Sequence, residues 1–183
     1  MPKAFITDID GTLTDDRRRL SMHAVEEIRR LVDAGIPVVL ASGNTVYFID
    51  ALSKMIGTSG DIIAENGGVY RHGYTGMRHA EGDRSICLAA YQKIVEHFRP
   101  KGEELRLYSN EYRYSDVAFA RDVEAEDVSR LLAGMPVQVI DTGFAIHLQP
   151  LGLSKGAALA KLAELMGLTP SALLAAGDSV HYV

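Results

Sequence analysis

The sequence predicts an α/β fold, in which a doubly wound parallel sheet is interrupted by an inserted α+β module. Apolar runs that end in glycine-containing turns alternate with helical patterns near the start of the chain and again after Pro150, whereas the order between them is α-β-β-α-β-β. Strands that alternate with helices imply a parallel sheet with crossover connections. We therefore expect a core domain formed by residues 1–75 and 150–183, and an inserted α+β domain at 76–149.

Hydrophobic spacing and turn residues predict the core elements. Apolar residues recur at helical spacing after Ser21, which is a suitable helix N-cap, and Ser154 takes the same place before another helix. The expected helices lie between Ser21 and Gly35, between Val46 and Gly57, and between Ser154 and Met166. The expected strands are residues 5–10, 38–41, 61–64 and 173–176. Residues 72–83 are rich in glycine and charge, and we expect a linker or hairpin there.

The inserted module has a different order of predicted helices and strands. Helical patterns cover about residues 84–98 and 124–134, and strand-like runs cover 105–109, 117–121, 137–142 and 144–149. This order favours a small antiparallel sheet with its helices on one face. Cys87 lies within the first of these helical patterns, so we expect its thiol to be buried.

Composition narrows the function classes. The net charge of −5, with no basic cluster larger than Arg17-Arg18-Arg19, argues against a nucleic-acid surface. The single cysteine, Cys87, excludes an internal disulfide and fits a reducing compartment. The sequence contains no signal-peptide pattern and no apolar run long enough to cross a bilayer. We expect a cytoplasmic protein with no nucleic-acid or membrane partner.

Polar groups capable of chemistry follow the expected strands and begin one of the expected helices. They are Asp8, Asp10, Ser42, Lys155 and Asp178. The carboxyl ends of strands in an open sheet border the crevice where ligands bind, so we expect these side chains to converge. Carboxylates suit Mg²⁺, and a hydroxyl and an ammonium group suit the oxygens of a phosphoryl group. Gly11 and Gly43 allow backbone N–H groups to approach the same oxygens.

This set resembles the haloacid-dehalogenase-like phosphatases over nearly the whole chain. The four matching motifs are Asp8-Ile9-Asp10-Gly11-Thr12, Ser42-Gly43-Asn44, Lys155 within Leu153-Ser154-Lys155-Gly156, and Gly177-Asp178-Ser179. The resemblance implies that the inserted module is the cap of this family. Within the family, Ser42-Gly43-Asn44, Glu65-Asn66-Gly67-Gly68 and Asn110-Glu111-Tyr112-Arg113 are similar to the archaeal-type phosphoglycolate phosphatases.

The resemblance also implies roles. Asp8 would be the nucleophile that becomes an aspartyl-phosphate, and Asp10 would act as general acid and then general base. Mg²⁺ would be held by Asp8, Asp10 through its backbone carbonyl, and Asp178. The phosphate would be held by Ser42, Gly43, Asn44 and Lys155. The implied activity is Mg²⁺-dependent hydrolysis of a small phosphomonoester, with phosphoglycolate as leading substrate and sugar phosphates as the alternative.

Specificity is expected to reside in the cap. The planar guanidinium of Arg113 suits a substrate carboxylate, although a surface arginine in a paired strand is an equal alternative. Asn44 and Asn66 are candidates for the entrance of the site, while Asn66-Gly67 is also an ordinary turn signal. We expect no zinc site, because no histidine has a second ligand at metal spacing. His147 is expected to be structural or to face the inner side of the cap.

The last motif departs from the family pattern. The Asn-Asp that usually follows Gly-Asp-Ser is replaced by His181-Tyr182, and the sequence ends at Val183. Loss of that acid is expected to weaken Mg²⁺ binding or activity by about 10–100-fold. The strand at Leu173 to Ala176 would lack cover on one side, which allows a homodimer through its edge. A catalytically weakened phosphate-binding relic and a phosphorylated signalling receiver domain are the competing hypotheses.

Overall fold

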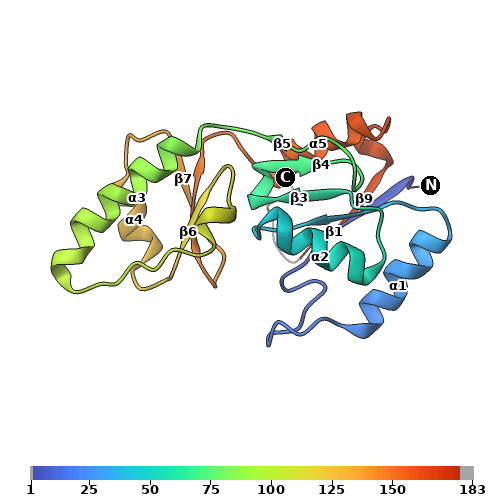
Figure 1. The fold of residues 1–183 in the computed structure, drawn as a ribbon, viewed down its shortest axis with the longest axis horizontal. Coiled ribbons are helices and arrows are strands. Elements are labelled where there is room, and N and C mark those ends of the chain that lie inside the picture. Colours follow the sequence, from blue (N-terminus) through green and yellow to red (C-terminus); the bar gives the residue numbers. More distant parts are fainter. Residues whose placement is uncertain (1, 178–183) are drawn as a thin grey trace. The chain divides into compact units, whose positions relative to one another are not determined.

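The computed structural model describes residues 2–177 and is shown in Figure 1. The chain divides into two compact units, one formed by Met1–Ala80 and Ser154–Val183 and the other by Glu81–Leu153. These divisions fall a few residues after the boundaries at 75/76 and 149/150 that the sequence suggested. Each unit has its own sheet and its own apolar core.

The first unit is built on a six-stranded sheet with the order β5-β4-β3-β2-β1-β9. Its strands are β1 (Ala4–Asp8), β2 (Val38–Ala41), β3 (Ile62–Ala64), β4 (Val69–Arg71), β5 (His79–Ala80) and β9 (Leu173–Ala176). Strands β1, β2, β3 and β9 pair in parallel, whereas β4 and β5 are antiparallel additions. The predicted α/β class with a parallel core is confirmed.

Helices cover both faces of this sheet. They are α1 (Met22–Asp33), α2 (Val46–Ile56) and α5 (Lys155–Leu165), together with the single 3₁₀ turns η1 (Glu65–Gly67) and η4 (Pro170–Ala172). Figure 1 shows α1 and α2 on one side of the sheet and α5 on the other. Ser21 and Ser154 cap α1 and α5 as expected, because their side chains accept hydrogen bonds from the first-turn N–H groups of Ala24 and Ala157.

The short strands β4 and β5 form a hairpin at one side of this sheet. A hairpin is one of the two structures expected over residues 72–83, and β5 pairs antiparallel with β4 and extends the sheet, although β4 itself precedes that range. Tyr70 of β4 is buried in the core beneath α5 and stacks on His79 of β5, with ring centroids 4.9 Å apart. The connecting loop is rich in glycine and charged residues, so the local sequence gives no clear strand signal for these short strands. They are stabilised by tertiary packing.

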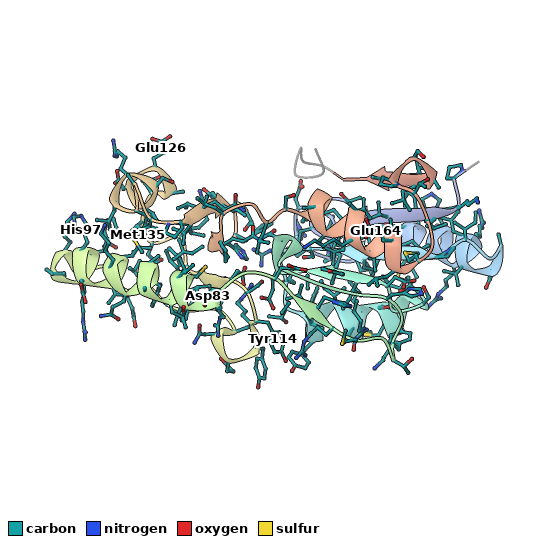
Figure 2. All side chains as sticks on the ribbon, turned by 90° about the horizontal axis from the view of Figure 1, so that it is seen from above. Asp83, His97, Tyr114, Glu126, Met135 and Glu164 are labelled. Carbon is teal, nitrogen blue, oxygen red and sulfur yellow. The ribbon has the colours of Figure 1, made fainter. Side chains whose placement is uncertain are left out.

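The second unit contains a three-stranded antiparallel sheet with the order β6-β8-β7. Its elements are α3 (Arg84–Phe98), η2 (Arg99–Lys101), η3 (Asn110–Tyr112), β6 (Val117–Phe119), α4 (Ala125–Leu131), β7 (Val137–Asp141) and β8 (Ile146–Pro150). Both α3 and α4 pack on one face of the sheet, as expected, while Glu126 on α4 points away from it (Figures 1 and 2). Neither α3 nor any other described helix is long and apolar enough to cross a membrane.

The strand predicted for residues 105–109 is wrong. Only Leu107 forms a bridge there, to Phe119 at the edge of β6. Ser109 then adopts a left-handed backbone conformation, with φ of 51°, and leads the chain into η3. A left-handed residue ends the extended backbone that a strand requires, so the pairing stops after one bridge.

Cys87 is buried in α3, as predicted, and contributes to the core of the second unit. Its thiol lies 3.8 Å from the carbonyl oxygen of Ser115. Burial, reinforced by the negative charge of Asp116, raises the pKa of the Cys87 thiol to about 12. The thiol is therefore protonated at neutral pH and serves as a packing group rather than a nucleophile.

Candidate active site

The parallel strands of the first unit end together at one edge of the sheet. Asp8 is the last residue of β1 and lies beside Ala41, the last residue of β2. Ser42 follows directly, and its N–H donates to the carbonyl oxygen of Ile63 in β3, at 3.0 Å. The sheet register therefore brings Asp8 next to the Ser42 loop, which is the location that open α/β sheets use for ligands.

Asp8 forms a buried ion pair with Lys155. Lys155 Nζ lies 2.7 Å from Asp8 Oδ1, and the two side chains are only 6% and 8% exposed. Side chains alternate along β1, so Asp8 shares its face of the sheet with Ile6, which packs in the α5 core. Lys155 begins α5 on that same face, which explains how two residues far apart in the sequence meet.

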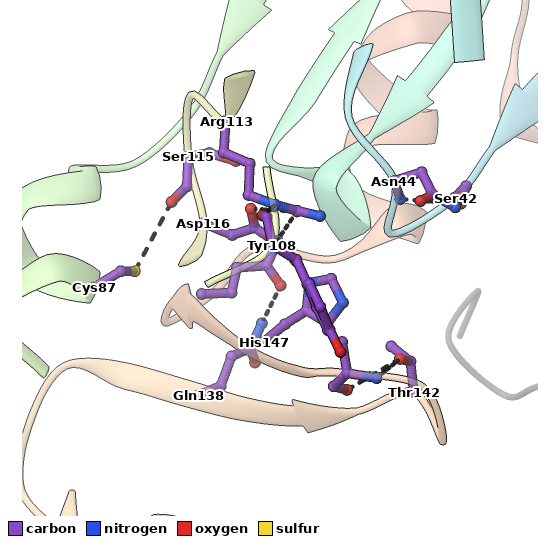
Figure 3. A network of polar contacts seen from close by, with 12 residues as sticks. Ser42, Asn44, Cys87, Tyr108, Arg113, Ser115, Asp116, Gln138, Thr142 and His147 are labelled. Carbon is purple, nitrogen blue, oxygen red and sulfur yellow. Dashed lines mark hydrogen bonds and ion pairs between the residues drawn. The ribbon is translucent and has the colours of Figure 1, made fainter. Parts of the chain in front are cut away.

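Asp10 is held by the loop that follows β2. Asp10 Oδ2 accepts hydrogen bonds from Asn44 Nδ2, at 3.0 Å, and from Ser42 Oγ, at 3.3 Å. Asn44 is fixed in turn, because its backbone N–H and its Nδ2 each lie 3.0 Å from Ser42 Oγ; this Ser42–Asn44 contact is drawn in Figure 3. Among residues 2–177 both donors to Asp10 reach Oδ2, so Oδ1 has no hydrogen bond to the protein there.

The backbone turns sharply after Asp10. Gly11 has a left-handed conformation, with φ of 76°, and its N–H donates to Thr14 Oγ1 at 3.2 Å. Leu13 N–H closes the turn on the carbonyl oxygen of Ile9, at 2.9 Å. A residue with a Cβ would be strained at position 11, so glycine is required for Asp10 to leave the strand and face the Ser42 loop.

Asp8 and Asp10 are the carboxylates that β1 and the turn after it supply to this edge. Between residues 2 and 177 the structure contains no group of three or more His, Cys, Asp or Glu side chains that could hold a metal. Asp178, the third carboxylate expected from the sequence, lies outside the described residues, as do Ser179, His181 and Tyr182. The carboxylate chemistry of this edge fits Mg²⁺, which is bound through one or two protein carboxylates and waters.

Arg113 belongs to the second unit, where it is neither on the surface nor in a strand, so that alternative from the sequence is wrong. Its Nη1 contacts both oxygens of Asp116, at 2.8 and 3.0 Å, and its Nε donates to the carbonyl oxygen of Tyr108, at 3.1 Å. His147 Nδ1 donates to Asp116 Oδ2 at 2.8 Å, which completes a buried network (Figure 3). A substrate carboxylate would have to compete with Asp116 for this guanidinium.

Asp116 is fully buried in this network. Burial by itself would raise the pKa of Asp116, but the hydrogen bond from His147 and the positive charge of Arg113 outweigh it and lower the pKa below the ordinary carboxyl value. Asp116 is therefore ionised at neutral pH and holds Arg113 and His147 together.

Two sets of contacts in this structure have no signal in the local sequence. Asp116 lies in a short polar loop, and nothing in the local pattern signals its pairing with His147, 31 residues away. The residues Glu65-Asn66-Gly67 indicate a turn, part of the entrance and a likeness to the archaeal-type phosphatases, but nothing in their sequence indicates that the turn touches both the Ser42 loop and the start of α5. Its two consecutive left-handed residues before Gly67 are visible only in the backbone.

Comparison with known proteins places this arrangement in a family. The family profile of haloacid dehalogenase-like hydrolases matches residues 5–130, which is more than half of the chain. The chain belongs to this family. Membership confirms the resemblance inferred from the four sequence motifs and identifies the protein as a hydrolase of the haloacid-dehalogenase-like type.

Individual relatives agree with this assignment. A Methanoculleus marisnigri protein called phosphoglycolate phosphatase is 56% identical over 98% of this chain and 77% of its own length. A Methanospirillum hungatei protein of the same name is 49% identical over 98% of this chain and 77% of its own length. The crystal structure of a Thermoplasma acidophilum protein superimposes with a TM-score of 0.85 at 26% identity, covering 99% of this chain and 79% of that one.

Proposed function

We propose that this haloacid-dehalogenase-like hydrolase is a Mg²⁺-dependent phosphatase that hydrolyses 2-phosphoglycolate through an aspartyl-phosphate on Asp8. The observation that carries the proposal is the buried pair of Asp8 and Lys155 at the edge of the sheet where Ser42 and Asn44 also hold Asp10. A carboxylate, an ammonium group and a second carboxylate bound on one oxygen are the groups that phosphoryl transfer through a carboxylate nucleophile requires.

Asp8 is proposed to attack the phosphorus atom. Its carboxylate forms a new O–P bond while the bond from phosphorus to the alkoxide oxygen of the substrate breaks. Lys155 restrains the carboxylate through the 2.7 Å contact to Oδ1, so that the nucleophile is oriented before the substrate arrives. The same ammonium group would offset negative charge on the phosphoryl oxygens in the transition state.

Asp10 is proposed to move the proton. It would donate a proton to the departing alkoxide and then remove one from the water that hydrolyses the aspartyl-phosphate. Ser42 and Asn44 both donate to Oδ2 of Asp10, and no donor among residues 2–177 reaches Oδ1, which is the oxygen proposed for this exchange. The Ser42 hydroxyl and the backbone of Gly43 would bind the phosphoryl oxygens once the substrate is present.

Asp8 and Asp10 are proposed to hold Mg²⁺, with Asp178 as a third ligand predicted from the sequence. The ion would neutralise the charge of the phosphoryl group, which two carboxylates would otherwise repel. Asp8 ends β1 and Asp10 follows two residues later, so the carboxylate of Asp8 and the backbone carbonyl of Asp10, the groups proposed to hold the ion, belong to one short segment.

The proposed substrate rests on the similar proteins named phosphoglycolate phosphatase. Arg113, with a guanidinium suited to a carboxylate, stays the proposed recognition residue for the glycolate end, and sugar phosphates stay the alternative substrates. Cytoplasmic location and a homodimer are further proposals that come from the sequence alone.

A substrate panel tests the proposal. Phosphate release would be measured from 2-phosphoglycolate, several sugar phosphates and p-nitrophenyl phosphate, each with Mg²⁺ and with excess chelator. We expect release that requires Mg²⁺ and is fastest, as kcat/KM, with 2-phosphoglycolate. Preference for a sugar phosphate would support the alternative substrate class. Binding of phosphate by the folded protein without turnover of any ester would contradict the proposed activity and favour a phosphate-binding relic.

A further inference from the structure

The turn between β3 and β4 has an unusual backbone. Glu65, Asn66 and Gly67 are consecutive residues in the left-handed region, with φ of 51°, 54° and 96°. Two of them carry side chains, and both of these side chains are buried. Residues other than glycine persist in this conformation only where the surrounding structure holds them there, and such positions cluster at functional sites.

On one side the turn is bound to the Ser42 loop. Glu65 N–H donates to the carbonyl oxygen of Asn44, at 3.0 Å, and Asn66 N–H donates to that of Ser42, at 3.2 Å. The side chain of Asn66 lies directly over Gly43, because a Cβ built on Gly43 would fall 2.8 Å from Asn66 Oδ1. The loop therefore needs glycine at position 43 to accept Asn66.

On its other side the turn supports the start of α5. A Cβ built on Gly67 would lie 2.1 Å from the carbonyl oxygen of Ser154 and 2.7 Å from the backbone nitrogen of Lys155. The backbone of Gly67 thus packs against the residue whose ammonium group reaches Asp8. One short turn touches both segments that carry the candidate phosphate ligands.

We propose that Asn66 is a positioning residue. Through its contact with Gly43 it holds the Ser42 loop in the position where Ser42 and Lys155 can bind one phosphoryl group. The inference rests on the proposed phosphatase function and adds to it a residue that needs no contact with the substrate. Asn66 is suited to this place because asparagine tolerates the left-handed conformation better than other residues with side chains.

A double-mutant cycle tests the inference. Gly43→Ala, Asn66→Gly and the double variant would be compared by affinity for inorganic phosphate in the presence of Mg²⁺, by kcat and KM, and by Tm. Glycine relieves the left-handed backbone, so Asn66→Gly should keep the Tm while phosphate affinity and kcat/KM fall by about 10- to 100-fold. Gly43→Ala should cause a comparable loss, since its Cβ displaces Asn66. In the Asn66→Gly background the Cβ has space, so Gly43→Ala should add almost nothing.

Two controls sharpen the result. Asn66→Asp keeps the shape and the left-handed preference, so Gly43→Ala should retain its full penalty in that background. Ser109→Gly relieves the same left-handed conformation in the second unit and should change neither phosphate affinity nor kcat/KM. Additive losses at positions 43 and 66, or wild-type phosphate affinity in Asn66→Gly, would overturn the inference while phosphatase activity stands. A coupled loss of phosphate affinity in a protein that hydrolyses no phosphomonoester would support the inference and contradict the proposed function.

Discussion

Asp8→Asn is expected to lower kcat for phosphomonoester hydrolysis by about 10⁴-fold or more, because the amide cannot form the aspartyl-phosphate. The amide is nearly isosteric with the carboxylate and can still accept a hydrogen bond from Lys155, which lies 2.7 Å from Asp8 Oδ1 in the wild type. We therefore expect a folded variant that binds inorganic phosphate. Steady-state kinetics measures the loss of kcat, circular dichroism checks that the variant is folded, and titration with inorganic phosphate checks that it still binds phosphate.

Asp15→Asn is the matched control. Asp15 lies in the loop after the same strand, where it pairs with Arg19 at the surface, and within residues 2–177 it belongs to none of the contacts described for Asp8. Exposed pairs contribute little, so this variant should retain wild-type kinetics. Turnover by a folded Asp8→Asn variant within tenfold of the wild type would exclude Asp8 as the nucleophile.

Asp116→Asn is expected to destabilise the chain by about 3–5 kcal/mol at pH 7, because it leaves the buried guanidinium of Arg113 without its anion. Arg113 and Asp116 are almost completely buried, so solvent screens this pair little. His147 would lose its charged acceptor at the same time. The shift in urea midpoint, with the m-value held in common, measures the loss.

The pH dependence of that loss has a definite sign. The pKa of Asp116 is lowered in the folded state from its ordinary value of 3.8, so the pair contributes fully above that value and the contribution disappears as pH falls through the folded pKa. The difference in free energy of unfolding between wild type and Asp116→Asn should have its full value at pH 6 and should shrink only below about pH 4. Asp127→Asn, which removes an exposed pair with Arg130, should have almost no effect at either pH. A difference that stays constant down to pH 3 would contradict the lowered pKa.

The parallel core follows from the sequence because its signals are local. Strands β1 and β2 are short apolar runs, and the glycine turns at Gly11 and Gly43 mark where the chain leaves the sheet. Once the strands are parallel, their carboxyl ends meet at one edge, so Asp8 and Lys155 can be expected to meet although they are 147 residues apart. The parallel arrangement of the strands therefore allows a long-range contact to be predicted from local sequence patterns.

Other parts of the structure depend on contacts that no local pattern contains. The pairing of β4 with β5 is stabilised by Tyr70, which packs beneath α5 from a distant part of the chain. The bond between Asp116 and His147 joins a loop to β8, and the left-handed conformation of Asn66 is imposed by the packing of Gly43 and α5 around it. For Arg113 the residue type indicated its capacity for bidentate pairing, but the partner in the structure is Asp116.

Identification of the phosphorylated residue tests most directly whether Asp8 is the nucleophile. The protein would be mixed with 2-phosphoglycolate and Mg²⁺, quenched in acid during turnover, reduced with borodeuteride and digested for mass spectrometry. Reduction converts an aspartyl-phosphate into deuterated homoserine, so we expect homoserine at position 8 that depends on substrate and is absent from Asp8→Asn. Substrate turnover with no homoserine at position 8, or with homoserine at position 10 instead, would contradict it.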